Sequence, residues 1–162
     1  MRILPLSRMA FSAAALVIAA GVPAYAGTLI KVDLWDQGSE AEMRTDLGMD
    51  MAGNPSMANM GLKLSTTAAK AGKVTFKVAN DSKELVHEMV IFPLPDGEKI
   101  PYDGAEAKIN EDAAGHLGEV SELNPDQTGA VTLDLKPGRY IVACNIPNHY
   151  ANGMWAVVTV TK

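Results

Sequence analysis

Residues 140–160 have the sequence YIVACNIPNHYANGMWAVVTV, and this stretch decides which fold and which site we expect. An apolar run ends at Cys144, the only cysteine of the chain, and a second apolar run begins at Met154. Four residues separate Cys144 from His149, and four more separate His149 from Met154. Thiolate, imidazole and thioether donors form a mixed, soft set that suits copper cycling between Cu(I) and Cu(II). The stretch therefore predicts a metal-binding loop between two strands.

A fourth ligand has to come from another part of the chain, and His87 is the candidate. It lies in residues 84–92, where apolar side chains occupy both faces of an expected central strand. A lone histidine in such a strand is usually a buried core residue. Two histidines and a cysteine with a long axial methionine, however, make a blue-copper site. We therefore predict one copper ion held by His87, Cys144, His149 and Met154.

These residues resemble those of the cupredoxin family, and the likeness covers roughly residues 61–162. The loop spacing is similar to that of rusticyanin and auracyanin, and it differs from the shorter cysteine-to-histidine interval of plastocyanin. The resemblance implies an all-β, Greek-key sandwich that holds one type 1 copper and is not an enzyme. It also implies that an edge of His149 reaches the surface inside a small apolar patch. The expected patch residues are Ile146, Pro147, Tyr150 and Ala151.

Alternating apolar and polar residues predict several short strands along the chain. The clearest runs are residues 28–35, 62–64, 74–78, 131–135 and 154–161. Turn residues separate the runs, which gives about seven or eight strands, as in a β-sandwich. Residues 93–124 are rich in proline and glycine, so we expect irregular structure there with a short helix inside 106–114. The expected organisation is a first strand and a methionine-rich loop in 27–60, followed by the cupredoxin domain in 61–162.

The start of the chain has the features of an export signal. Arg2 and Arg8 give a positive beginning, and residues 9–22 are apolar. Ala-Tyr-Ala at 24–26 is a typical cleavage motif, so we expect removal of residues 1–26 and a periplasmic mature protein. An uncleaved anchor is the alternative. The mature chain has 12 basic and 19 acidic residues, a net charge of −7, which argues against nucleic acid and anionic lipid as partners.

Methionines crowd the segment between the first strand and residue 60, which shows no stable periodicity. They are Met43, Met49, Met51, Met57 and Met60. One interpretation is packing, because methionine fills irregular gaps in a core. The other is a second, weak Cu(I) site at Met49 and Met51, because thioethers favour Cu(I). The sequence leaves both open.

Glu88 departs from the pattern of the family. Many cupredoxins have asparagine directly after the first histidine ligand, where it ties the two ligand segments together. A carboxylate here could lower the potential, accept a hydrogen bond behind a ligand, or face solvent. The His-Glu pair also resembles cupredoxins linked to copper tolerance.

Two functions remain open from the sequence. The first is a mobile, monomeric electron carrier that docks transiently with redox partner proteins, such as a cytochrome or a copper oxidoreductase. We expect no interaction with a membrane. The second is a copper-handling protein for tolerance or delivery, which the methionines and Glu88 favour. An oxidase or reductase would need further histidines for a catalytic copper, and only His116 is left. We expect His116 to be an exposed loop residue.

Overall fold

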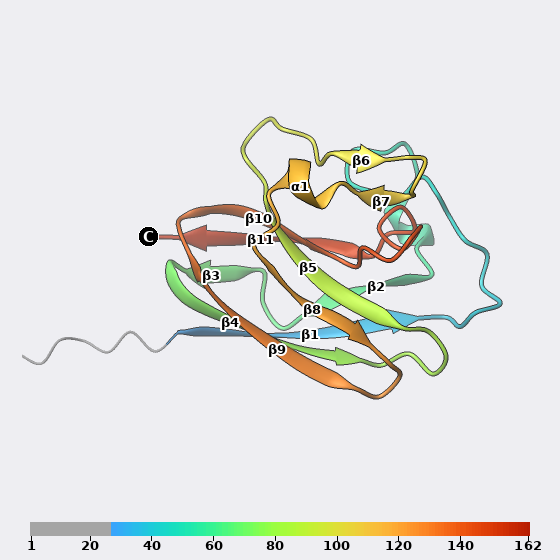
Figure 1. Ribbon diagram of the computed structural model, residues 1–162, viewed down its shortest axis with the longest axis horizontal. Helices are drawn as coiled ribbons and strands as arrows, with labels where there is room; N and C mark the ends of the chain where they lie inside the picture. The colour runs from blue at the N-terminus through green and yellow to red at the C-terminus, as the bar shows by residue number, and fades with distance from the viewer. Residues whose placement is uncertain (1–26) are drawn as a thin grey trace, which may run out of the picture.

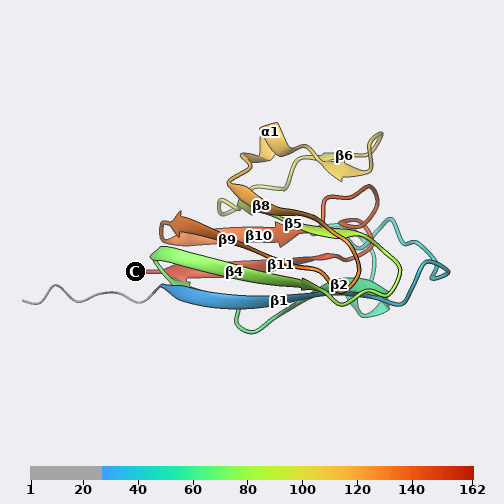
Figure 2. The same cartoon turned by 60° about the horizontal axis from the view of Figure 1, so that its bottom comes forward.

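The computed structural model describes residues 27–162, which form a sandwich of two β-sheets (Figures 1 and 2). The four-stranded sheet has the order β2-β1-β4-β9, with β1 Thr28–Asp36, β2 Met60–Leu64, β4 Gly72–Asn80 and β9 Thr128–Leu135. The five-stranded sheet has the order β3-β11-β10-β5-β8, with β3 Ala68–Lys70, β5 His87–Pro93, β8 Gly118–Leu123, β10 Gly138–Ala143 and β11 Trp155–Thr161. The predicted all-β sandwich is confirmed. The predicted export signal lies outside the described residues.

The main core lies between the two sheets and is formed by the apolar side chains at every second position of the strands. Ile30, Val32 and Leu34 of β1 are fully buried, and so are the inward side chains of β4. β1 and β4 run parallel, with Val32 opposite Val78. Burial of each large aliphatic side chain contributes about 1.5–3 kcal/mol to folding. Residues 27–60 therefore share one sandwich with residues 61–162, because β1 is an inner strand of its sheet.

The central strand β5 is buried on both of its faces. Met89 and Ile91 face the main core, whereas Val90 and Phe92 belong to a second apolar cluster with Tyr150. Two small elements cover this second cluster on the outer side of the five-stranded sheet (Figure 2). They are the ribbon of β6 (Tyr102–Asp103) with β7 (Lys108–Ile109), and the helix α1 (Glu111–Ala114).

Two elements differ from the sequence-based expectation. The helix expected within 106–114 shrinks to Glu111–Ala114, because Lys108–Ile109 pairs with Tyr102–Asp103 as a strand. β8 lies in a segment that was expected to be irregular. Its pairing with β5 shifts register between His87 and Met89, so its buried residues are three apart and the two-residue alternation is broken.

Residues 37–59 connect β1 to β2 and contain one short 3-10 helix, Pro55–Met57. In Figure 1 this connection runs around the end of the sandwich opposite the C-terminus. Within residues 27–162, no helix combines the length and the apolar character needed to cross a bilayer.

Candidate metal centre

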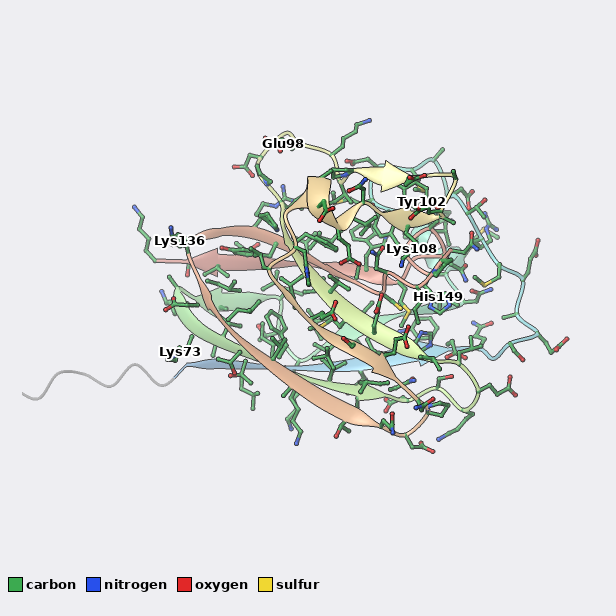
Figure 3. All side chains as sticks on the ribbon, in the orientation of Figure 1. Lys73, Glu98, Tyr102, Lys108, Lys136 and His149 are labelled. Carbon is green, nitrogen blue, oxygen red and sulfur yellow. The ribbon has the colours of Figure 1, made fainter. Side chains whose placement is uncertain are left out.

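The four predicted ligands come from chain segments that meet at one pole of the sandwich. His87 begins β5 and Cys144 directly follows β10, and these antiparallel neighbours place the two residues at the same end of the sheet. His149 lies in the loop after Cys144, and Met154 directly precedes β11. Figure 3 shows His149 at this end of the molecule.

The donor atoms of the two histidines and the cysteine converge. His87 Nδ1 lies 3.2 Å from His149 Nδ1 and 3.9 Å from Cys144 Sγ. Cys144 Sγ lies 3.3 Å from His149 Nδ1. His87 and Cys144 are fully buried, and His149 is 7% exposed. Such separations suit donors that each bind one shared ion at about 2.0–2.3 Å.

Met154 is held next to these donors by the backbone. Its N–H donates to the carbonyl of His149 at 3.0 Å, and its carbonyl accepts from the Cys144 N–H at 3.0 Å. Its side chain is fully buried and belongs to the same core cluster as Cys144. Thiol, two imidazoles and a thioether are the donor set of a blue-copper site, so the residues present fit copper.

Burial sets the protonation of the metal-free site. It raises the pKa of the Cys144 thiol to about 12 and lowers the pKa of His149 to about 4, the latter helped by the neighbouring His87. Burial also lowers the pKa of His87, against the opposing effect of Asp36. Near neutral pH both imidazoles are therefore neutral and ready to bind metal, while the thiol must release its proton on metal uptake.

We expect the metal-free protein to lose stability as the pH falls from 7 toward 4. Between the ordinary pKa of 6.5 and the folded value of about 4, His149 binds its proton more readily in the unfolded chain. The free energy of unfolding should then fall by up to about 1.4 kcal/mol per pH unit for this residue, and the lowered pKa of His87 acts in the same direction. Urea unfolding at pH 7, 6 and 5 measures the slope. His149→Gln should reduce this slope, and equal slopes in the variant and the wild type would contradict the lowered pKa of His149.

Asp36 is a site residue that the sequence analysis missed. Its Oδ2 lies 2.8 Å from His87 Nε2, and the two side chains are 2% and 0% exposed. Burial alone would raise the pKa of Asp36, but hydrogen bonds from Ser82, His87 and the Gly38 N–H outweigh it and lower the pKa. Asp36 ends a strand with no local motif, 51 residues before His87, so no spacing signal marks it.

Glu88 touches the site through its backbone. Its N–H donates to Cys144 Sγ at 3.4 Å, and this backbone bond is open to every residue type except proline. The side chain is half-buried, and burial together with nearby Glu119 raises its pKa. Burial above all, and the acidic neighbours after it, therefore disfavour the charged form of this carboxyl group.

Asn145 ties the ligand loop to the outer ribbon. Its fully buried amide accepts from the Ile109 N–H at 2.7 Å and donates to the Ile109 carbonyl at 3.0 Å and to Glu111 at 2.8 Å. These bonds fix the residue that directly follows Cys144, so β7 and α1 help to hold the thiol in place.

Residues 44–59 cover the ligand loop from the other side. The Leu47 N–H donates to the Ala151 carbonyl at 2.7 Å, and the Trp155 indole donates to the Leu47 carbonyl at 2.7 Å. Tyr150 and Ala151 are consequently 1% and 0% exposed. The expectation that these two residues belong to a surface patch is wrong, because this cover buries them.

The methionines of this segment divide into two groups. Met49 and Met51 pack against the second apolar cluster beside Tyr150, and Met60 is buried in the main core. Met43 and Met57 are 44% and 54% exposed. The contacts of Met49 and Met51 are therefore those of packing side chains.

His116 lies apart from the four ligands. It is exposed, as expected, and it faces Glu111 and Glu119 at 3.9 Å and 3.6 Å.

Comparison with known proteins identifies the family and the fold of this chain. The family model described as "Sulfocyanin (SoxE) domain" matches residues 70–162. No curated protein matches the chain by sequence. The fold is similar to that of reduced auracyanin from Roseiflexus castenholzii, with 19% identity over 84% of this chain and 98% of that one and a TM-score of 0.52.

It is also similar to rusticyanin from Thiobacillus ferrooxidans, with 17% identity over 85% of this chain and 80% of that one and a TM-score of 0.51. The chain therefore belongs to the sulfocyanin (SoxE) domain family, a cupredoxin family whose members are electron carriers and not enzymes, and its buried type 1 copper site consists of His87, Cys144, His149 and Met154.

Proposed function

We propose that this protein is a periplasmic carrier that passes single electrons between redox partner proteins. The observation that carries the proposal is the convergence of the His87, Cys144 and His149 donor atoms in a buried cluster beside Met154. Bound copper supplies the one-electron couple. Location in the periplasm is supported by the export-type sequence of residues 1–26.

The ligands are fixed by contacts that do not depend on the metal. Backbone hydrogen bonds join Cys144 to Met154 and Met154 to His149, and the Asn145 amide anchors the loop from outside. A site held in this way changes little when the oxidation state changes, which favours fast electron transfer. Catalysis of bond making would need an open ligand position, and the burial of all four ligand side chains does not favour one.

Partners are proposed to be a cytochrome or a copper oxidoreductase that docks briefly on a monomer. His149 is the most exposed of the four ligands, at 7%, and the half-buried Ile146 and exposed Pro147 precede it in the same loop. A small apolar contact of this kind suits a transient complex. The mature net charge of −7 supports partners with a basic surface and disfavours nucleic acid.

The test is the visible and EPR spectrum of the copper-loaded mature protein. An intense thiolate-to-copper band with one copper per chain, bleached by reductant and restored by oxidant, is the expected result. A colourless copper complex, or one that cannot be cycled, would remove the basis for an electron carrier.

Copper handling is the competing function, and Cu(I) stoichiometry separates it from electron transfer. We expect one Cu(I) equivalent in a titration against a competing chelator, because Met49 and Met51 are engaged in packing. The matched control changes Met43, Met49, Met51 and Met57 to leucine and keeps the core residue Met60. Leucine preserves bulk while removing sulfur, so folding should survive. A second equivalent that disappears in this variant would favour copper handling.

Met154→Leu should keep copper and raise the reduction potential. A long axial thioether contributes little to metal affinity, and its removal takes a weak donor away and leaves a drier axial side. Redox titration and the copper-to-protein ratio at neutral pH measure both effects. Met60→Leu, in the same core cluster but outside the donor set, is the control for the loss of a buried sulfur. Loss of copper from Met154→Leu alone would contradict the axial role.

A further inference from the structure

We propose that Asp36 is a positioning residue for the copper site, which fixes the orientation and tautomer of His87 and lowers the reduction potential through its negative charge. This inference rests on the proposed electron-transfer function, because it assigns what sets the potential of that same site. It concerns a residue outside the segment 70–162 that matches the family model.

The contact between Asp36 and His87 is short and dry. Oδ2 of the carboxylate lies 2.8 Å from Nε2 of the imidazole, with side-chain exposures of 2% and 0%. The other oxygen, Oδ1, accepts the Gly38 N–H at 2.7 Å. Each oxygen of the carboxylate therefore has an N–H donor, and the Ser82 side chain adds a further hydrogen bond to the carboxylate. A carboxylate held by N–H donors at both oxygens is stabilised as the anion.

This contact decides which nitrogen of His87 binds metal. A neutral imidazole has one N–H, and a carboxylate acceptor at Nε2 places the proton there. The lone pair is then on Nδ1, which lies 3.2 Å from His149 Nδ1 and 3.9 Å from Cys144 Sγ. Asp36 thus lies on one side of the His87 ring, and the donor atoms of His149 and Cys144 lie on the other side. A histidine ligand whose second nitrogen donates to a carboxylate is fixed in rotation and becomes a stronger donor.

The charge of Asp36 acts on the redox equilibrium as well. A buried anion one imidazole away from the metal favours Cu(II) over Cu(I), because Cu(II) carries the larger positive charge and the surroundings screen little. The potential should accordingly be lower than that of the same donor set with a neutral acceptor behind His87.

The position of Asp36 in the fold makes this contact a link between the sheets. Asp36 ends β1 in the four-stranded sheet, whereas His87 begins β5 in the five-stranded sheet. The hydrogen bond therefore joins the two layers of the sandwich at the metal pole. Through this side chain, residues 27–60 make a direct hydrogen bond to the ligand His87.

The experiment compares Asp36→Asn with Asp33→Asn in the copper-loaded protein. The amide can still accept from Nε2 but has no charge, so Asp36→Asn should keep the visible band and raise the potential. We expect at least a tenfold rise in the Cu(I)-to-Cu(II) ratio at a fixed applied potential, which is about 59 mV for one electron. Asp33 lies on the same strand with its side chain away from the core residues, and its loss should change the ratio less than twofold. Equal shifts in the two variants would overturn the role of the charge.

A second measurement tests the tautomer without relying on electron transfer. Nitrogen-15 NMR of the histidine rings, in the diamagnetic Cu(I) protein and in the metal-free chain, should show His87 protonated at Nε2, with a slowly exchanging proton. Asp36→Ala should speed that exchange by at least tenfold. Protonation at Nδ1 in the metal-free wild-type chain would overturn the positioning role. A missing visible band in wild type would instead count against the proposed function, and the metal-free spectrum would still report on Asp36.

Discussion

Replacing Cys144 with serine should abolish the intense visible absorption of the copper-loaded protein. The band arises from charge transfer between a thiolate sulfur and the metal, and Cys144 is the only cysteine of the chain. A serine hydroxyl is a hard donor that stays protonated at neutral pH, so it cannot supply either the band or the affinity of a thiolate. We expect more than tenfold weaker absorbance at equal copper occupancy and weaker copper binding.

Folding of this variant should survive, which makes the result interpretable. Cys144 is fully buried, and serine is close to it in size and can accept the Glu88 N–H in place of sulfur. Urea unfolding of the metal-free variant and the metal-free wild type checks this point. Persistence of the band in a folded Cys144→Ser protein would show that sulfur coordination has been assigned to the wrong residue.

Asn145→Ala should destabilise the protein by about 3 kcal/mol. The substitution leaves the N–H and carbonyl of Ile109 without their side-chain partner, and each unsatisfied buried group costs about 1–3 kcal/mol. The metal-free protein should show this loss as a lower urea midpoint. The copper-loaded protein should also release metal to a chelator faster, because the residue after Cys144 is no longer anchored.

Asn124→Ala provides the control for that experiment. Asn124 is exposed and its side-chain amide donates a hydrogen bond to Gln127 at 3.2 Å, so its loss should stay within about 0.5 kcal/mol. If the two variants are equally stable, the Asn145 amide does not contribute to the anchoring of the ligand loop.

The metal ligands were predictable because their signal is chemical and mostly local. Cys144, His149 and Met154 are close in sequence, and the kinds of donor they offer suit few ions. His87 was found because copper requires a fourth donor. The strands with regular alternation were predictable for the same reason, since one buried face imposes a period of two. β8 was missed because a register shift breaks that period.

The surroundings of the site depend on tertiary contacts that leave no mark in the sequence. Asp36 meets His87 only because β1 and β5 end at the same pole, in different sheets. Asn145 is one of several asparagines in the loop, and nothing local distinguishes it from Asn148. The packing of Met49 and Met51 likewise depends on the position of residues 44–59 over the ligand loop, which no local pattern specifies.

That cover has a consequence for protein engineering. Among cupredoxins the stretch between the cysteine and methionine ligands is an obvious cassette to exchange, since it differs in length between proteins. In this chain the cassette is bonded to a second segment, through Leu47 to Ala151 and through Arg44 to the Asn152 side chain. Gly153, with φ +100°, lies so close to Ala58 that an added Cβ would come within 2.8 Å of it. Residues 44–59 and 144–154 should therefore be transferred together into another cupredoxin. A graft of residues 144–154 alone would expose the surface that residues 44–59 cover in this chain.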